Sequence, residues 1–418
     1  MSSKQTVTID TDRLRERFDA YSEIGATDNG GLHRLTLSDA DRAVRDRFVE
    51  DLHDVGLDVR VDELGNVFGR YPGRDPDAAP VFVGSHLDSQ PYGGKYDGQL
   101  GVLTALEAVN AIAESDVEPD RPIDVVNWTN EEGSRFQVSM MGSGGYVGHK
   151  RIDELLEVTD RDGKTVGGEL ERIGYDGEEP CEPPATGIHS YLEVHSEQGP
   201  ILDDADLPVG IVDGVYGLAW LQVTIEGKAD HAGPTPMSNR RDALVAATDA
   251  ISEINRLPGG LSEDAVATVG SIEVEPDSIN VIPSRATFTV DVRSYDDAVV
   301  DRGLDRVEAE IAAACDRHGV EYDIEPLSRH HSIEFSETVR SAADRGAEAA
   351  GVDVTHLLSG AGHDAQHLQS VTDSGMLFVP SVDGLTHSEA EFTEWEDCLE
   401  GARVFAQATV ELATDGPD

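Results

Sequence analysis

Cysteine, positive charge and long apolar stretches are all scarce in this sequence of 418 residues. The cysteines Cys181, Cys315 and Cys398 are odd in number and far apart, so they cannot build a disulfide framework, and we expect ordinary thiols. No apolar run approaches the roughly 20 residues that a membrane-spanning helix needs. The segment 1–12 is polar and has no apolar core, so we expect no signal peptide and a cytoplasmic protein.

Basic residues number only 32, against 82 acidic residues, which gives a formal net charge of −50. A surface with so little positive charge is unsuited to nucleic acid or to an anionic membrane, so we expect neither as a partner. The acidic residues are spread along the whole chain and do not form a tail. A dispersed acidic surface repels itself unless salt screens the charges, which indicates a high-salt, halophilic cytoplasm.

Apolar runs and helical patterns alternate through most of the chain, whose length indicates two domains. Alternation of this kind predicts crossover connections and an α/β fold with a mostly parallel sheet flanked by helices. The predicted strands of this part are 80–84, 123–128, 191–194 and 376–379. The predicted helices are 11–21, 38–55, 98–114, 337–350 and 394–412.

The pattern changes near Gly214. Segments 219–226 and 286–293 alternate apolar and polar residues, and a helical pattern over 240–256 lies between them. Such alternation is typical of a sheet with one open face, so we predict a smaller α+β domain. The chain then divides into a catalytic domain in two parts, 1–213 and 330–418, and an inserted domain, 214–329.

Polar residues that can bind metal follow two of these strands. His86 comes at the end of one strand, Asp88 follows it, and Asp97 lies in a Gly-rich loop before a helix. Ligands bind at the carboxyl ends of strands in such sheets, and a carboxylate commonly orients a ligating histidine. Asp88 suits that role, and Asp97 could bridge two ions. A structural histidine with a helix-capping aspartate is the alternative.

Glu131 and Glu132 are adjacent carboxylates that follow the strand 123–128. Buried neighbours of like charge repel unless a cation lies between them, and one of the pair could bind a metal while the other takes a proton from water. The pair Glu178 and Glu179 has the same composition but lies in a Gly/Pro-rich loop, where a solvated pair is expected.

Two further histidines complete a ligand set, because His195 ends the strand near 191–194 and His387 follows the strand 376–379. Three imidazoles and two carboxylates are enough for two divalent ions that share one carboxylate. Zinc, manganese, cobalt and nickel all accept such ligands, so the metal stays open. The set is His86, Asp97, Glu132, His195 and His387.

Taken together, these motifs resemble the amidase/hydantoinase/carbamoylase family of two-metal hydrolases, a branch of the aminoacylase-like metallopeptidase superfamily with a zinc-exopeptidase-like fold. The resemblance covers nearly the whole chain. The motifs are Gly30-Gly31 with Arg34, Gly84 to Asp88, Gly93 to Gly98, Asn130 to Phe136, His195 to Pro200, Asp230 to Met237, Asn280 with Pro283, Asp291 to Arg293 and Ser359 to Asp364. Thr386 stands where such sequences often have serine, and His195 favours this branch over peptidase-like relatives.

The resemblance implies a role for each matching residue. Asp97 is then the bridging ligand, Asp88 orients His86, and Glu131 is the general base. The inserted domain is expected to act in dimerisation and as a lid, which makes a homodimer the expected assembly. The substrate contacts implied are Gln198, His231, Asn280, Arg293 and His363.

These substrate roles also agree with the chemistry of the side chains. Arg293 offers a planar fork for a carboxylate, and His231 could polarise the carbonyl under attack. The alternatives stay open: Arg293 as an ion-pair partner of Asp291 or Asp296, His231 as a packing residue of its proline-rich turn, and His363 as a structural residue.

The expected reaction is hydrolysis of the carbamoyl C–N bond of an N-carbamoyl-L-amino acid by a metal-bridged water that Glu131 activates. Allantoate and β-ureidopropionate are alternative ureido carboxylates, and an N-acyl-amino acid or dipeptide is more remote. If the protein is not an enzyme, the alternative is a binding or regulatory module that holds metal without turnover.

Overall fold

The computed structural model describes residues 6–414; the start of the segment 1–12 and the last four residues of the expected domain 330–418 lie outside that range. The chain separates into two compact units. The first comprises Met1–Asp213 and Phe335–Asp418, and the second comprises Gly214–Glu334. The second part of the first unit therefore begins at 335, where we expected 330. None of the described helices is both long and apolar enough to cross a membrane.

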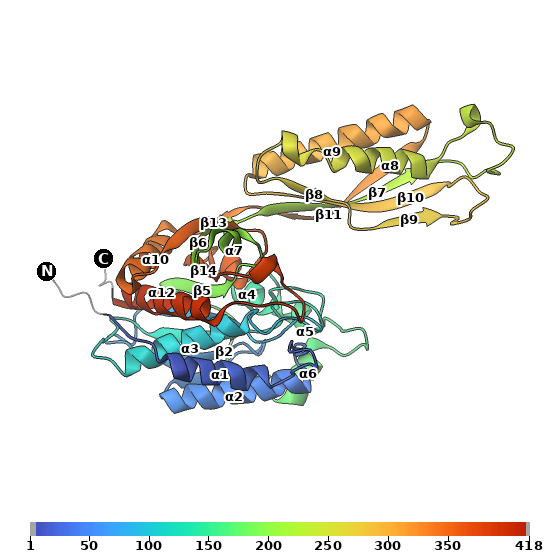
Figure 1. The fold of residues 1–418 in the computed structure, drawn as a ribbon. Coiled ribbons are helices and arrows are strands. Elements are labelled where there is room, and N and C mark those ends of the chain that lie inside the picture. Colours follow the sequence, from blue (N-terminus) through green and yellow to red (C-terminus); the bar gives the residue numbers. More distant parts are fainter. Residues whose placement is uncertain (1–5, 415–418) are drawn as a thin grey trace. The chain divides into compact units, whose positions relative to one another are not determined.

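The first unit is built on a mixed sheet in the order β1-β2-β4-β3-β5-β14-β6, with β13 also paired to β6 (Figure 1). The central strands β4, β3, β5 and β14 are parallel, and β1, β2 and β6 run antiparallel to their neighbours. This arrangement confirms the predicted α/β class. The strands are β1 Asp58–Val61, β2 Val67–Tyr71, β3 Val81–His86, β4 Ile123–Trp128, β5 Ser190–Ser196, β6 Val209–Val215, β13 Val354–Ser359 and β14 Asp373–Val379; β12 Ile333–Glu334 belongs to the second unit.

Strands β3, β4 and β5 are buried along their whole length, and β14 is buried except for its first residue, Asp373, as expected for a parallel sheet covered on both faces. Helix α3 packs on β3, and α12 packs on β5, β14 and α10. Nearly every residue of α3 is buried, which agrees with its mostly apolar sequence, and its buried Glu107 forms an ion pair with Arg13. The helices of this unit are α1 Thr11–Ser22, α2 Asp39–Val55, α3 Gln99–Ala113, α4 Met141–Tyr146, α5 Ile152–Leu156, α6 Val166–Ile173, α7 Ile201–Ala205, η3 Val382–Gly384, α10 Glu337–Ala350, α11 Asp364–Leu368 and α12 Trp395–Thr414.

The ends of α2 follow directly from its sequence. The Ser38 side chain accepts the N–H of Asp41, and Gly56 ends the helix in the left-handed conformation with φ 85°. Serine at the N-cap and glycine just after the helix are the residues that these positions favour. The predicted helix 38–55 is confirmed in type and extent.

The second unit is a five-stranded sheet with two helices, α8 and α9, on one face (Figure 1). On β7, residues alternate between a buried row that includes Leu221 and Val223 and a less buried row that includes the exposed Trp220. The alternation predicted for 219–226 and 286–293 is therefore present. The elements are β7 Gly217–Glu226, η1 Met237–Asn239, α8 Ala243–Ile254, η2 Pro258–Gly260, β8 Val266–Thr268, β9 Ile272–Glu275, β10 Arg285–Ser294, α9 Asp297–His318 and β11 Glu321–His330.

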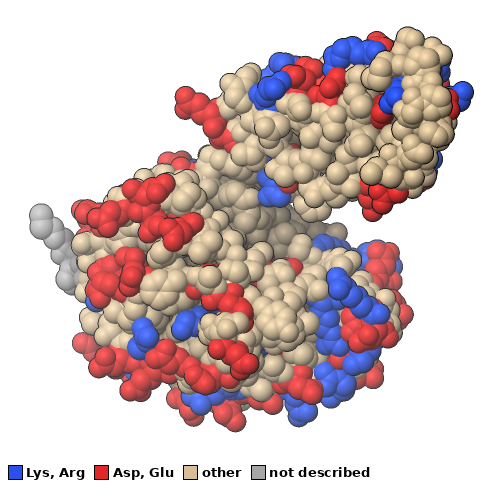
Figure 2. Space-filling view, turned by 45° about the vertical axis from the view of Figure 1, so that its right-hand side comes forward, with Lys and Arg blue, Asp and Glu red and all other residues tan. Residues whose placement is uncertain are grey.

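Acidic side chains are distributed over the visible face of each unit (Figure 2). Basic side chains are fewer and many form ion pairs, such as Arg172 with Asp39 and Arg285 with Glu226. The negative charge is thus spread over the visible face of both units and does not mark a site, which leaves the site to be found from its geometry.

Candidate metal centre

The candidate ligands gather at the carboxyl ends of the central strands of the first unit. His86 is the last residue of β3, and His195 lies one residue before the end of β5. Glu132 follows β4 and His387 follows β14. Because these four strands are parallel, their ends meet at one edge of the sheet, where ligands bind in such folds.

Asp97 joins these side chains into two groups. Its Oδ1 lies 3.3 Å from His86 Nε2 and 3.2 Å from His195 Nε2. Its Oδ2 lies 3.5 Å from His387 Nε2, and that nitrogen lies 3.6 Å from Glu132 Oε2. The groups His86–Asp97–His195 and Asp97–Glu132–His387 each have ligand atoms spaced for one metal ion. All five predicted ligands are therefore together.

The two buried histidines are oriented by backbone carbonyl groups. Nδ1 of His86 lies 3.0 Å from the carbonyl oxygen of Asp88, and Nδ1 of His195 lies 3.0 Å from that of Ser196. If each Nδ1–H donates to its carbonyl, Nε2 carries the lone pair and faces Asp97. His86 Nε2 is buried and has no hydrogen-bond partner among the described residues. An unpartnered imidazole nitrogen aimed at carboxylates is what a metal ligand requires.

The electrostatics of the centre also fit cations. Burial raises the pKa of Glu131 and of Glu132 well above the usual value, and neighbouring carboxylates add to both increases. Burial also disfavours the charge of Asp97, but the adjacent imidazoles of His195 and His86 hold its pKa well below the usual value. Three carboxylates crowded into a buried space repel one another, and divalent cations would relieve that repulsion.

Glu132 has a partner that we did not predict. Its Oε1 accepts the backbone N–H of Gln90 at 2.8 Å, and its Oε2 accepts the Gln90 side-chain amide at 2.8 Å. These bonds fix the carboxylate while Oε2 still faces His387. Gln90 belongs to the loop that follows His86 and Asp88. Its presence in that loop is the only feature of the sequence that could have indicated this contact with Glu132.

Asp88 contacts both His86 and Glu131, although not as expected. Its Oδ1 lies 3.7 Å from His86 Nδ1, beyond hydrogen-bond distance, and the backbone carbonyl of Asp88 takes that place. The carboxylate instead accepts the backbone N–H of Glu131 at 3.2 Å. Glu131 Oε2 lies 3.6 Å from His86 Nε2, so the predicted base borders the first ligand group.

Two predicted substrate residues of the first unit lie in the same place. The Gln198 amide donates to Asp97 Oδ2 at 3.0 Å. The His363 ring lies 4.5 Å from the His195 ring between centroids, and His363 Nε2 is buried without a hydrogen-bond partner among residues 6–414. Both residues therefore border the ligand groups.

His231, Asn280 and Arg293 belong to the second unit. The segments of His231 and Asn280 are adjacent, since the N–H of Ala232 donates to the carbonyl of Asn280 at 3.1 Å. Arg293 on β10 donates from Nε and Nη2 to Asp291, so the ion pair named as the alternative is present. Both His231 and Asn280 are exposed.

Two buried glutamates near the ligands were also missed. Glu193 accepts the hydroxyl of Ser85 at 2.7 Å and the N–H of Ala365 at 3.2 Å. Its signal was a glutamate inside an otherwise apolar strand. Glu391 accepts the N–H groups of Tyr96 and Asp97. One glutamate among so many acidic residues gave no signal.

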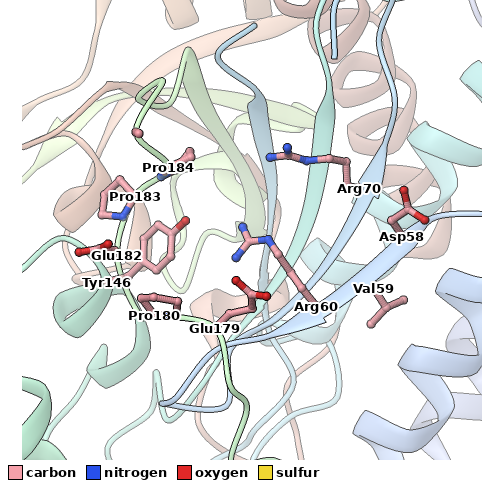
Figure 3. A pocket seen from close by; sticks show the side chains of 11 residues that line it. Asp58, Val59, Arg60, Arg70, Tyr146, Glu179, Pro180, Glu182, Pro183 and Pro184 are labelled. Atoms are coloured by element: carbon pink, nitrogen blue, oxygen red, sulfur yellow. The ribbon is translucent and has the colours of Figure 1, made fainter. Parts of the chain in front are cut away.

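A separate cavity of about 340 Å³ lies beside β1 and β2 and is lined by Arg60, Arg70 and Tyr146 among others (Figure 3). Arg70 Nε lies 2.7 Å from Oδ1 of the buried Asp124. The guanidinium carbon of Arg60 lies 3.7 Å from the centroid of the Phe68 ring. Its guanidinium groups thus have intramolecular partners, and none of the predicted site residues lines this cavity.

Comparison with known proteins agrees with this geometry. Residues 82–411 match peptidase family M20/M25/M40. An N-carbamoyl-L-amino-acid amidohydrolase of Rhizobium meliloti is 40% identical over 97% of this chain and 97% of its own length. Allantoate amidohydrolase of Escherichia coli is 30% identical over 96% of this chain and 97% of its own.

Among solved structures, an amidase of the hydantoinase/carbamoylase family from Burkholderia multivorans superposes with a TM-score of 0.93. It is 41% identical in sequence, and the match covers 98% of this chain and 99% of the other. The likeness extends over both units and over every element that carries a candidate ligand. The chain therefore belongs to peptidase family M20/M25/M40 and, within it, to the hydantoinase/carbamoylase amidases.

Proposed function

We propose that this protein hydrolyses the carbamoyl C–N bond of an N-carbamoyl-L-amino acid. The observation that carries the proposal is the pair of ligand groups that share Asp97, with Glu131 beside them. The similarity to the Rhizobium meliloti amidohydrolase over nearly the full length supports this substrate class. The products are the free amino acid, ammonia and carbon dioxide.

The five clustered residues would hold two divalent metal ions. His86, Asp97 and His195 form one site, and Asp97, Glu132 and His387 form the other. Ions held there act as Lewis acids, which polarise a carbonyl and make water more acidic. Mixed imidazole and carboxylate ligands suit zinc, and they also suit manganese, cobalt and nickel.

Glu131 moves the proton in this scheme. It takes a proton from the attacking water and delivers it to the departing nitrogen, as a general base and then a general acid. Asp88 positions it, because the Asp88 carboxylate binds the backbone N–H of Glu131. Gln198 orients the shared Asp97 carboxylate, to which its side-chain amide donates.

The substrate carboxylate and the carbonyl under attack need their own partners. Arg293 offers two parallel N–H donors for the substrate carboxylate. When substrate binds, its carboxylate would take the place of the Asp291 carboxylate as the partner of Arg293. Asn280 adds a donor, and His231 stabilises the developing negative charge on the carbonyl oxygen. His363, whose Nε2 has no hydrogen-bond partner among the described residues, is the proposed substrate contact close to the ligand groups.

Allantoate is the second candidate substrate, favoured by the similarity to the Escherichia coli allantoate amidohydrolase. It too combines a ureido group with a carboxylate. β-Ureidopropionate has the same pair of groups, and an N-acyl-amino acid lacks the second nitrogen. All of these substrates require the same centre, so a side-by-side assay separates them.

We also propose a homodimer that forms through the second unit and works in a cytoplasm of high salt. The exposed apolar side chains Trp220 and Leu327, on β7 and β11, support an interface on this unit. Light scattering after size-exclusion chromatography in high salt tests the dimer; a monomeric mass at micromolar concentration contradicts it.

The substrate is tested by ammonia release in high salt with Zn²⁺ or Mn²⁺ present. N-carbamoyl-L-amino acids, allantoate and β-ureidopropionate are compared, and free amine is measured for an N-acetyl-amino acid. Turnover of N-carbamoyl-L-amino acids with the highest kcat/KM is expected. Cleavage of the acetyl compound alone, or of no compound by metal-loaded protein, would falsify the proposal.

A further inference from the structure

Glu391 lies in the segment that carries His387 and joins that segment to the loop that carries Asp97. Its Oε1 accepts the backbone N–H groups of Tyr96 at 3.2 Å and of Asp97 at 3.1 Å. Its Oε2 accepts the hydroxyl of Thr386 at 3.3 Å. Glu391 is only 5% exposed. Its carboxylate thus accepts hydrogen bonds from the predicted ligand Asp97 and from Thr386, the residue before the predicted ligand His387.

The carboxylate of Glu391 occupies space that a side chain at Gly94 would otherwise fill. A Cβ atom at Gly94 would lie 2.1 Å from Oε1 of Glu391, so any side chain there would displace it. Glu391 itself comes from a fixed segment, because its N–H donates to the carbonyl of Ser388 and the next residue, Phe392, accepts the N–H of Val382. The carboxylate therefore reaches the Asp97 loop from a rigid support.

The ligand group that contains His387 needs such support more than the other group does. His86 and His195 lie on central strands, and backbone carbonyls fix their rings. His387 lies in a loop with φ 53°, in the left-handed region, and its side chain is 48% exposed. A non-glycine residue keeps that conformation only where its surroundings hold it. The link from Thr386 to Glu391 is one such restraint.

We propose that Glu391 is a positioning residue that sets the separation of Asp97 and His387 and thereby selectively controls binding of the ion held by Asp97, Glu132 and His387. It touches neither ions nor substrate and acts through the two loops. This role rests on the proposed metal centre. The first group depends on Glu391 less, because two of its three members, His86 and His195, lie on central strands.

Metal binding by the full-length, metal-free protein tests this role without reference to activity. Calorimetric titration with Zn²⁺ and the visible spectrum with Co²⁺ both distinguish the two sites. In Glu391→Ala we expect one site close to wild type and the other weakened by about 10- to 100-fold, as for other residues that orient ligands. Glu391→Gln should stay within about threefold of wild type, because its amide oxygen still accepts both N–H groups.

Glu389→Ala is the matched control, since Glu389 lies two residues earlier and its carboxylate accepts the Asn29 amide instead. It removes the same charge from the same segment and should bind both ions as wild type does. If Glu391→Ala does not fold, Thr386→Val removes only the hydroxyl and should weaken the same site by a smaller factor.

Each outcome decides the question. Wild-type binding of both ions by Glu391→Ala or, where that variant is unfolded, by Thr386→Val overturns the positioning role, and so does an equal loss at both sites. If the wild-type protein itself binds no divalent ion, the proposed metal centre fails first, and the role of Glu391 falls with it.

Discussion

The backbone N–H of Glu131 donates to the carboxylate of Asp88 at 3.2 Å. The backbone carbonyl of the same aspartate faces Nδ1 of His86 at 3.0 Å. One residue thus positions the proposed base with its side chain and a proposed ligand with its main chain. Substitution of the Asp88 side chain should therefore affect proton transfer more than metal binding.

Asp88→Ala is expected to lower kcat by about 10- to 100-fold, the usual effect of removing a partner behind a metal site. Asp88→Asn should lose less, because its amide oxygen can still accept the N–H of Glu131. Metal content after dialysis is the control and should match wild type in both variants. Wild-type kcat in Asp88→Ala would show that Glu131 needs no such support.

Glu131→Gln keeps the shape of the side chain and removes its ability to take a proton. The expected loss in kcat is about 10²- to 10⁴-fold, the range for a general base. Bound metal should remain, since Glu131 belongs to neither ligand group. Full activity in this variant would rule out Glu131 as the base. It would also leave the two ligand groups without an adjacent proton carrier.

The two ligand groups should respond separately to substitution. His86→Ala is expected to weaken only the site that it shares with His195, and His387→Ala only the site that it shares with Glu132. Asp97→Asn should weaken both, because both groups use its carboxylate. Metal analysis after dialysis against a weak chelator measures this. A loss of both ions in His387→Ala with none in Asp97→Asn would contradict the shared ligand.

Salt should stabilise the protein strongly because its net charge is −50. The Debye length falls from about 10 Å at 0.1 M salt to about 3 Å at 1 M, so repulsion among the dispersed carboxylates is screened. Thermal unfolding in increasing KCl should show a steadily rising Tm. A Tm that does not change, or that falls, would mean that the acidic surface adds no repulsion to the folded state.

Much of the sheet that carries the candidate metal centre could be predicted, because its strands and the polar residues at their ends are visible in local sequence pattern. Apolar runs predicted β3, β4 and β5, and the polar residues at their ends predicted which side chains would meet. Parallel pairing then brings His86 and His195 to one edge whatever the details of the loops. Asp97 and His387 lie in loops, so their meeting with the other predicted ligands depends also on the loop conformations.

The features that escaped prediction depend on the folded structure. Helix α9, the longest in the described part of the chain, is not among the predicted helices, although its buried residues Val300, Val307 and Ile311 recur at helical spacing. Gln90 and Glu391 reach their partners only when distant loops come together, and the bond from Glu391 to Asp97 spans 294 residues. Neither contact leaves a trace in local sequence pattern.

The central claim is that hydrolysis of a ureido carboxylate depends on two ions held around Asp97. Its most direct test titrates metal-free protein with Zn²⁺ or Mn²⁺ in high salt while ammonia release from an N-carbamoyl-L-amino acid is followed. The account predicts that the metal-free protein is inactive and that activity reaches its plateau at two equivalents of metal per chain. Full activity in the metal-free protein, or a plateau at one equivalent, would contradict it.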